Sequence, residues 1–214
     1  MNIFRILGDV AHLLAVSFLI FKLHTSRSLR GLSFTTQVLY LVVYCYLDTL
    51  WQQYQVSMYN TVGKVCWFGS SVYIVAVMKL KFSASTRDHG PESIRIEHLA
   101  GPCLALALCF NHLSTATEVL WTFSIYLEAV AILPQLFLTY KLRHDNERGP
   151  LIEPADGDDG FVEYLVLMSS YRAFYIANWI HRYLNEQFVD PISMYGGLVQ
   201  TGFYVAFFVL YYLQ

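Results

Sequence analysis

Apolar runs long enough to cross a membrane recur along the chain, and they restrict its fold more than any other feature. A helix of about 20 residues spans roughly 30 Å of hydrocarbon. Hydrophobic residues make up 56% of the 214 residues and charged residues only 14%, a composition that is unusual for a soluble domain. We therefore predict an all-α integral membrane protein that forms one domain over residues 1–214. The predicted transmembrane helices are seven, at about residues 3–22, 35–54, 58–78, 98–113, 118–140, 161–181 and 192–213.

Lysine and arginine are unevenly distributed between the predicted loops. The loops after the first, third and fifth spans are basic, whereas "QQYQVSMYN" and "NHLSTATE" contain no lysine or arginine. Basic loops face the cytosol under the positive-inside rule, so we expect a lumenal N-terminus and a cytosolic C-terminus. The basic residues in or beside those three loops are Lys22, Arg27, Arg30, Lys79, Lys81, Arg87, Arg95, Lys141, Arg143 and Arg148. The acidic loop at about 141–160, rich in Gly, Pro and Asp, is expected to be a flexible cytosolic linker.

The fifth span contains a proline and partly resembles the first span. Aligning "LGDVAHLLAVSFLIFKL" with "LEAVAILPQLFLTYKL" superposes Asp9 on Glu128. This alignment fits a repeated three-helix unit joined by the fourth helix. Pro134, in "ILPQL", removes a backbone hydrogen bond, so we expect a kink in the fifth span.

Charged side chains within the spans provide the main functional signal. Each costs about 2.5–3.5 kcal/mol near the bilayer centre, so such groups line an interior cavity or pair with one another. Helical spacing in "YRAFYIANWIHR" predicts one polar face along the sixth span, made of Tyr171, Tyr175, Asn178 and Arg182, with Arg172 and Trp179 on its flank. The two arginines are roughly 15 Å apart along the axis, which suits an extended peptide with several acidic groups. The alternative is structural, with the arginines paired to Asp48, Glu118 and Glu128 to lock the bundle.

His12 lies in the first span together with Arg5 and Asp9. A histidine on an apolar face is usually a core residue with a satisfied hydrogen bond. Its ordinary pKa near 6.5 also makes it able to respond to mildly acidic pH. Both interpretations remain open from the residues alone.

The chain contains no motif that would support an enzyme. Its four cysteines lie in apolar spans without a CxxC pair, so we expect packing residues and neither a disulfide framework nor a zinc site. No glycine-rich phosphate loop, nucleophile elbow or His-Glu metal motif is present. A net charge of -2 provides no electrostatic footprint for nucleic acid.

Five blocks of the sequence closely resemble the KDEL receptor family, the ER lumen protein-retaining receptors. The blocks are "MNIFRILGDVAHL", "YLD", "LWTFSIYLEAVAILPQLF", "YRAFYIANWIHRY" and "GLVQTGFY". The resemblance implies a SWEET-like or PQ-loop-like fold, with two three-helix bundles joined by the fourth helix, in ER and Golgi membranes. It also implies a receptor that binds C-terminal Lys/His-Asp-Glu-Leu tails in the acidic Golgi, returns to the ER in COPI-coated vesicles and releases its ligand at neutral pH.

The resemblance assigns roles to individual residues. Acidic residues would hold the positive first residue of the signal beside an aromatic surface, and arginines would hold its acidic groups and carboxylate. The implied signal-binding residues are Arg5, Tyr46, Asp48, Glu118, Trp121, Arg172, Tyr175, Asn178, Trp179 and Arg182. His12, Glu128 and Tyr171 resemble the family's proton-sensing cluster, in which a protonated histidine strengthens its bond to the glutamate and favours the ligand-bound form. The implied partners are ER-resident proteins with such tails, the COPI coat and membrane lipid, with protons as the effector and no other cofactor.

Three features depart from the family's pattern. Cys45 precedes Tyr46 where the family has an arginine that binds the ligand's terminal carboxylate. Ala206 replaces the seventh-helix aspartate that is associated with retrieval, and the chain ends at Gln214 without a short basic tail. We therefore expect these departures to affect ligand binding and retrieval, while the rest of the sequence keeps its resemblance to the family.

Two other functions stay open. A PQ-loop transporter would move a small solute by alternating access, with a proline-containing helix in each half and a mostly neutral site at the midplane. The first span has no proline opposite Pro134, and the predicted cavity is strongly charged. A paralogue without retrieval activity would keep the fold and bind a variant signal or nothing.

Overall fold

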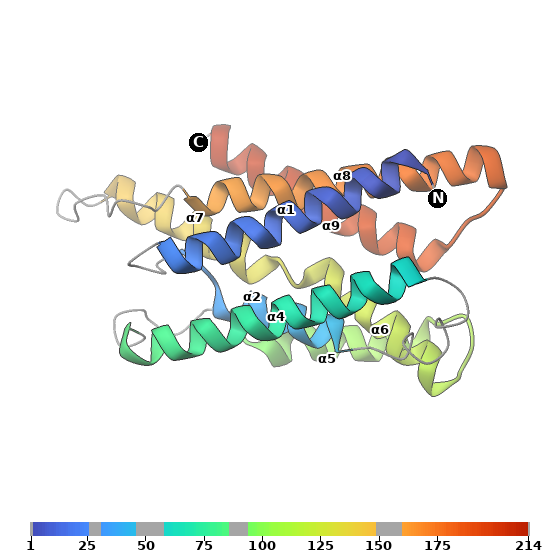
Figure 1. Cartoon of the computed structure of the whole chain (residues 1–214), viewed down its shortest axis with the longest axis horizontal. Helices are drawn as coiled ribbons and strands as arrows, with labels where there is room; N and C mark the ends of the chain where they lie inside the picture. Colours follow the sequence, from blue (N-terminus) through green and yellow to red (C-terminus); the bar gives the residue numbers. More distant parts are fainter. Residues whose placement is uncertain (1, 26–30, 46–57, 86–93, 149–159, 214) are drawn as a thin grey trace. The chain divides into compact units, whose positions relative to one another are not determined.

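The computed structural model describes residues 2–25, 31–45, 58–85, 94–148 and 160–213, and their regular structure is helical (Figure 1). The helices are α1 (Ile3–Thr25), α2 (Phe34–Tyr44), α4 (Met58–Ser85), α5 (Ile96–Cys109), α6 (Ala116–Val130), α7 (Leu133–Arg148), α8 (Gly160–Glu186) and α9 (Pro191–Leu213). The chain forms two compact units, which are described separately. The first unit contains Met1–Leu32 and Gln135–Gln214, and the second contains Ser33–Pro134.

Each of the seven predicted spans contains helical residues, which confirms the all-α prediction. The fifth span is divided between α6 and α7, because the helix is interrupted at Ala131 and Ile132, just before Pro134. A proline in the first turn of a helix leaves no intrahelical hydrogen bond unmade, so α7 accommodates it without loss. The helix is thus interrupted beside Pro134, but α7 loses no hydrogen bond to it, and the predicted kink stays a prediction. How the helices combine into three-helix bundles stays a prediction.

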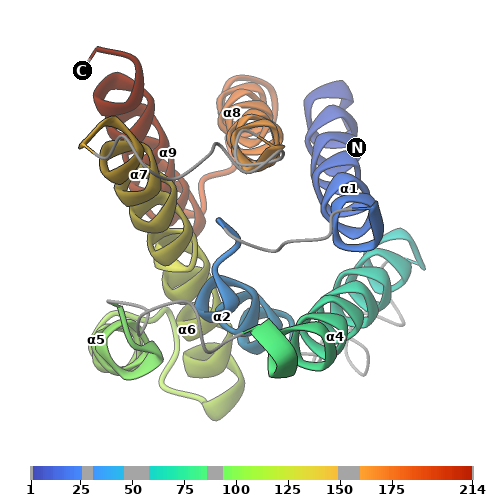
Figure 2. The same cartoon turned by 90° about the vertical axis from the view of Figure 1, so that its left-hand side faces the viewer.

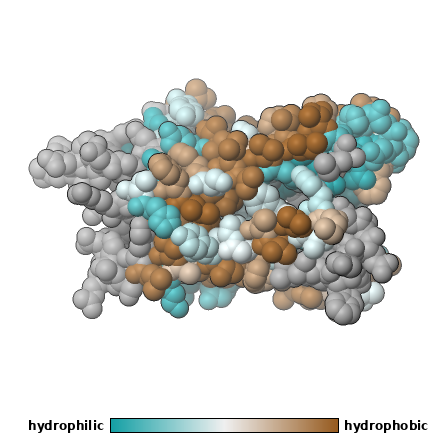
Figure 3. Space-filling view, in the orientation of Figure 1, coloured by the Kyte–Doolittle hydropathy of each residue, from teal (hydrophilic) through white to brown (hydrophobic). Residues whose placement is uncertain are grey.

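Several of the described helices suit a membrane by length and composition. Four segments are long and apolar enough to cross one, namely Ile3–Thr25, Met58–Leu80, Ala116–His144 and Pro191–Leu213. Phe34–Tyr44 and Ile96–Cys109 are apolar but shorter. Hydrophobic residues gather along α1 in Figure 3, whereas hydrophilic residues lie where α8 ends. The exposed Val10, Leu13, Leu14 and Phe21 account for this apolar surface of α1, which fits contact with lipid.

In the first unit, α8 packs along α1, and α9 packs against α8 (Figure 1). α1 and α8 are antiparallel, since Asn2 at the start of α1 contacts Asn178 late in α8. Towards the middle of the two helices, His12 stacks on Tyr171. The apolar core between and beside them includes Ala15, Leu19, Leu23, Leu165 and Met168, all of which are buried.

In the second unit, α2 lies between α4 and α6, and α5 packs against α6 (Figure 2). Two of these helices begin with a capping hydroxyl. Ser33 Oγ accepts a hydrogen bond from the backbone N–H of Thr36 at 3.1 Å, and Thr115 Oγ1 accepts one from that of Glu118 at 3.3 Å. The second cap places Glu118 in the first turn of α6, where the helix dipole favours a negative charge.

A buried hydrogen bond joins the segment after α1 to α7 within the first unit. Gly31 has a φ of 83°, a left-handed conformation that favours glycine. A side chain there would also crowd Phe161, whose ring lies 3.2 Å from the ideal Cβ position. The amide nitrogen of Gln135 donates to the carbonyl oxygen of Gly31 and to the hydroxyl of Thr139. Gln135 is fully buried, so these bonds satisfy polar groups that water cannot reach.

Replacing Gln135 with methionine is expected to destabilise the first unit. The two side chains are similar in volume, but methionine leaves the buried Gly31 carbonyl without its donor, at a cost of about 1–3 kcal/mol in the free energy of unfolding. Thermal denaturation of the purified protein in detergent measures this cost. Gln187→Met, at an exposed position after α8, is the control and should leave the midpoint unchanged. Equal midpoints for the two variants would contradict the stabilising role of the Gln135 hydrogen bond.

Candidate functional site on helix α8

The predicted polar face of the sixth span lies on one uninterrupted helix, α8. Residues spaced three, four and seven apart on such a helix share one side, so Tyr171, Tyr175 and Asn178 lie together as predicted. All three contact α1, through His12, Asp9 and Asn2 respectively. α1 is therefore the element that positions this side of α8.

His12 and Tyr171 form the contact nearest the middle of the two helices. Both side chains are buried, and their rings stack with centroids 4.6 Å apart and an interplanar angle of 15°. The amide nitrogen of Gln200, on α9, lies 3.5 Å from the hydroxyl of Tyr171. Two of the three predicted proton-sensing residues are thus in contact. The third, Glu128, lies on α6 in the second unit.

Tyr175 is held by a carboxylate for which the sequence predicted no role. Its hydroxyl donates to Asp9 Oδ1 at 2.6 Å. Gly8 permits this approach, because the Cβ of a larger residue would lie 2.7 Å from the Tyr175 ring. Asp9 precedes His12 by three residues, which places both on one face of α1. That spacing is the signal that could have indicated Asp9.

Trp179 continues a row of aromatic rings towards the end of α8. The rings of Tyr171 and Tyr175 meet edge to face with centroids 6.1 Å apart, and those of Tyr175 and Trp179 with centroids 6.2 Å apart. Gly197 of α9 faces Trp179 so closely that a Cβ at Gly197 would overlap the indole. Tyr171, Tyr175 and Trp179 form what we call the aromatic row. A glycine on each neighbouring helix makes room for it.

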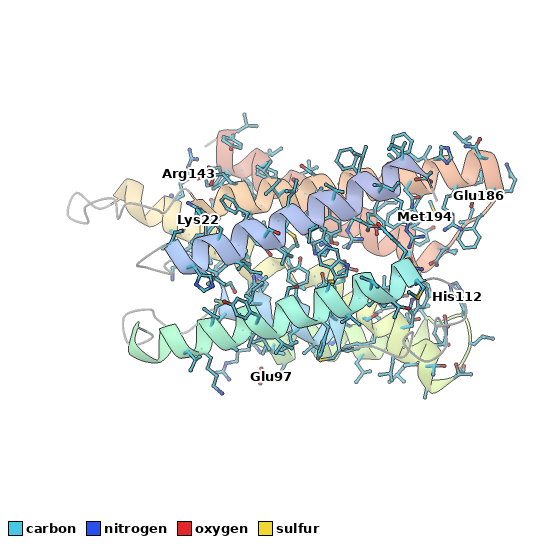
Figure 4. All side chains as sticks on the ribbon, viewed as in Figure 1. Lys22, Glu97, His112, Arg143, Glu186 and Met194 are labelled. Carbon is cyan, nitrogen blue, oxygen red and sulfur yellow. The ribbon has the colours of Figure 1, made fainter. Side chains whose placement is uncertain are left out.

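The two arginines of α8 have different surroundings. Arg172 is buried, and its guanidinium lies 4.9 Å from the centroid of the Tyr171 ring. The Arg182 side chain is 33% exposed and donates from Nε to Glu186 at 2.9 Å, near the end of α8 (Figure 4). This hydrogen bond lowers the pKa of Glu186, which lies beyond the predicted span 161–181. Arg182 also lies over the Phe188 ring, 3.9 Å from its centroid. Of these two arginines, Arg182 is the one that a dissolved ligand can reach.

The predicted site residues that the structure describes in the second unit lie on α6. Glu118 is in its first turn and Glu128 is near its C-terminal end. Trp121 lies at a tilt to His112, with ring centroids 6.0 Å apart. Pairing of the two carboxylates with arginines of the first unit stays a prediction, since each unit is described by itself.

Two predicted site residues, Tyr46 and Asp48, lie outside the described residues. Cys45, immediately before them, follows the last turn of α2, and its backbone N–H donates to the carbonyl oxygens of Leu41 and Val42. Its side chain is exposed and carries a free thiol. The side chain at this position is therefore small and uncharged.

The arrangement along α8 suits recognition of an acidic ligand with an apolar end. The partly exposed guanidinium of Arg182 lies near the end of the helix, and the buried guanidinium of Arg172 lies nearer its middle. The aromatic row provides the apolar surface. Within the described ranges, no three His, Cys, Asp or Glu side chains stand together as a metal site.

Known proteins similar to this chain share one description. Residues 28–182 match the family model described as ER lumen protein retaining receptor. The chain is 45% identical to the ER lumen protein-retaining receptor of Drosophila melanogaster, over 99% of this chain and 93% of that protein. It is 43% identical to that of Petunia hybrida over 99% and 94% of the two chains. It is 42% identical to ER lumen protein-retaining receptor 3 of Mus musculus, over 99% of this chain and 92% of that protein.

Gly197→Ala is expected to destabilise the protein, because the added methyl group would overlap the indole of Trp179. Overpacking of this kind costs about 1–3 kcal/mol. Gly202→Ala on the same helix is the matched control. No described heavy atom lies within 4 Å of a Cβ at Gly202, so the helix propensity of alanine should raise stability there by about 0.5–1 kcal/mol. Thermal denaturation in detergent measures both variants, and shifts of the same sign would contradict the packing of Trp179 on Gly197.

Proposed function

The chain belongs to the ER lumen protein retaining receptor family, and on this premise we propose that it binds the C-terminal signals of escaped ER lumen proteins and returns these proteins to the ER. The ligand would be a Lys/His-Asp-Glu-Leu type tail. Such a tail combines a positive first residue, two acidic residues, an apolar last residue and a free carboxylate. The chain is a multi-pass membrane protein. Because the proposed ligands are proteins of the lumen, its site would be reached from the lumen.

The observation that best supports this ligand is the ion pair at the end of α8. Arg182 already holds a carboxylate there, that of Glu186, at 2.9 Å. Both partners are part exposed, and an exposed pair of this kind costs little to separate. An acidic group of the signal would replace Glu186 as the partner of Arg182. The aromatic row beside it would provide apolar surface for the terminal leucine.

The spacing of charges on α8 fits the length of the signal. Arg172 and Arg182 are ten residues apart on one helix, or roughly 15 Å along its axis. An extended tail of four residues spans about 13–14 Å. Arg172 and Arg5 would add to the positive field around the acidic groups, while Glu118 with Trp121 would hold the positive first residue.

We propose a proton-dependent step at His12, which is in contact with Tyr171, the second residue of the implied proton-sensing cluster. Protonation of His12 in the acidic Golgi would favour an interaction with a carboxylate, for which the family resemblance implies Glu128, and with it the ligand-bound form. At neutral pH an uncharged imidazole would bind a carboxylate less strongly, and the signal would be released in the ER. The difference in pH between the two compartments would thus set the direction of transport.

The family and the distribution of basic residues support a cellular route that we propose as well. We place the N-terminus in the lumen and the C-terminus in the cytosol, with return from the Golgi to the ER in COPI-coated vesicles. Lys22 of α1 and Arg143 of α7 lie at one end of the first unit, and Glu186 lies at the other (Figure 4). Basic residues at one end support a cytosolic face there under the positive-inside rule.

The transporter alternative has less support. α1 is unbroken over 23 residues, whereas the fifth predicted span is interrupted between α6 and α7. A PQ-loop transporter that works by alternating access would need a broken helix in each half. A paralogue with an altered ligand remains the second candidate, because Cys45 stands where the family has a carboxylate-binding arginine.

A labelled peptide that ends in Lys/His-Asp-Glu-Leu is expected to bind the full chain in detergent at pH about 5.5 and much more weakly at pH about 7.4. His12→Ala should flatten this pH dependence, because it removes the imidazole that we propose to gain a proton at acidic pH. Fluorescence polarisation measures both effects. His24→Ala, at an exposed position at the end of α1, is the control and should keep the parental profile.

Two results would decide against these proposals. Absence of binding at either pH, in protein shown to be folded, would overturn the receptor function. A parental pH profile in His12→Ala would remove only the proton-sensing role.

Arg182→Ala is expected to weaken binding at acidic pH by tens to thousands of fold. Removing one charged partner of a desolvated carboxylate costs about 2–5 kcal/mol. Glu186→Gln is the matched control, because it removes the resident carboxylate but keeps the guanidinium. That variant should bind as tightly as the parent chain or more tightly. If both variants lost affinity equally, the ion pair would have a structural role and not a binding role.

A further inference from the structure

Asn2 connects the beginning of α1 to the last turns of α8. Its Oδ1 accepts a hydrogen bond from the backbone N–H of Arg5 at 3.0 Å, so Asn2 is the N-cap of α1. Its Nδ2 donates to Oδ1 of Asn178 at 2.8 Å and lies 3.3 Å from Nδ1 of His181. The sequence predicted a ligand-binding role for Asn178 but none for Asn2 or His181.

The cap determines which way round the Asn2 amide lies. A backbone N–H can only donate, so the atom that faces the Arg5 nitrogen is the amide oxygen, and Nδ2 faces α8. Each hydrogen of Nδ2 then has an acceptor, one on Asn178 and one on His181. The orientation of the amide therefore follows from its partners.

This orientation determines what Asn178 can offer to a ligand. The Oδ1 of Asn178 accepts from Asn2, so the Nδ2 of Asn178 points away from Asn2. The two hydrogens of this Nδ2 are donated to no described residue. Asn178 is only 4% exposed, and its amide nitrogen can still donate to an acceptor that reaches it. A carboxylate is such an acceptor. An amide turned the other way would present an oxygen, which would repel a carboxylate.

The state of His181 follows from the same contact. Nδ1 can accept from Asn2 only when it carries no proton, so the neutral ring has its hydrogen on Nε2. The ring of Phe4 lies beside that of His181, with centroids 6.0 Å apart. Asn2 thus selects the amide orientation of one α8 residue and the tautomer of another.

We propose that Asn2 is a positioning residue of the ligand site, which turns the Asn178 amide so that its hydrogens face an acidic group of the signal. With its ring neutral, His181 accepts the second hydrogen of Nδ2 and so holds Asn2 in place. This inference rests on the proposed function. It extends that function by assigning roles to two residues that act through Asn178 and not on the ligand itself.

Asn2→Ser tests the proposal, because serine keeps a helix cap but is too short to donate to α8. Binding of the labelled Lys/His-Asp-Glu-Leu peptide at pH about 5.5 should weaken about three- to tenfold, as for loss of one neutral hydrogen bond. In an Asn178→Ala background, the same substitution should cause no further loss, because no amide is left to orient. An unchanged affinity in the first background, or equal losses in both, would overturn the proposal.

A second measurement does not depend on the peptide. Nitrogen-15 NMR of histidine-labelled full chain at pH about 7.4 should show His181 with its proton on Nε2 and a hydrogen-bonded Nδ1, and Asn2→Ser should remove the signature of that bond. A proton on Nδ1 in the parent chain would overturn the proposal even if Asn2→Ser did not fold. Failure of the parent chain to bind the peptide would instead overturn the proposed function, whatever the tautomer.

Discussion

The packing of α1 against α8 is the interaction on which the first unit depends. In a membrane, apolar surfaces alone do not drive helices together, because lipid tails are as apolar as leucine side chains. Small residues and polar contacts therefore decide which faces meet. Gly8 lets Tyr175 approach α1, and the hydrogen bonds from Tyr175 to Asp9 and from Asn2 to Asn178 fix the register of the two helices.

That register also decides what each charged group of α8 can do. A guanidinium within a bilayer is costly unless a partner compensates it, and the ring of Tyr171 provides part of that compensation for Arg172. Arg182 lies near the end of the helix with an exposed carboxylate as its partner, so it can exchange partners at small cost. The direct attraction of an acidic ligand would therefore come mainly from the end of α8, with Arg172 contributing through its field.

The length of the apolar runs and the helical period predicted the spans and the shared side of Tyr171 and Tyr175. These features depend only on local chain geometry, which periodicity reports directly. The partners on α1 were not predicted. Periodicity shows which residues of one helix share a face, but it does not show which face of another helix they meet. Asp9 therefore had no role in the predicted site, and Asn2 was overlooked because it precedes the first apolar run.

The side of α8 that packs on α1 would also serve binding, and this limits how its residues can contribute. Tyr171 and Asn178 are buried and committed to α1, so they would act by setting geometry or by responding to protonation of His12. Cys45 supplies no positive charge at the position where the resemblance predicts an arginine, so the guanidinium groups of α1 and α8 would carry more of the recognition of the signal's acidic groups. Recognition of those groups would then depend closely on the contact between α1 and α8. The hydrogen bonds of Asn2 and Asp9 would thus influence affinity although neither residue would need to touch the ligand.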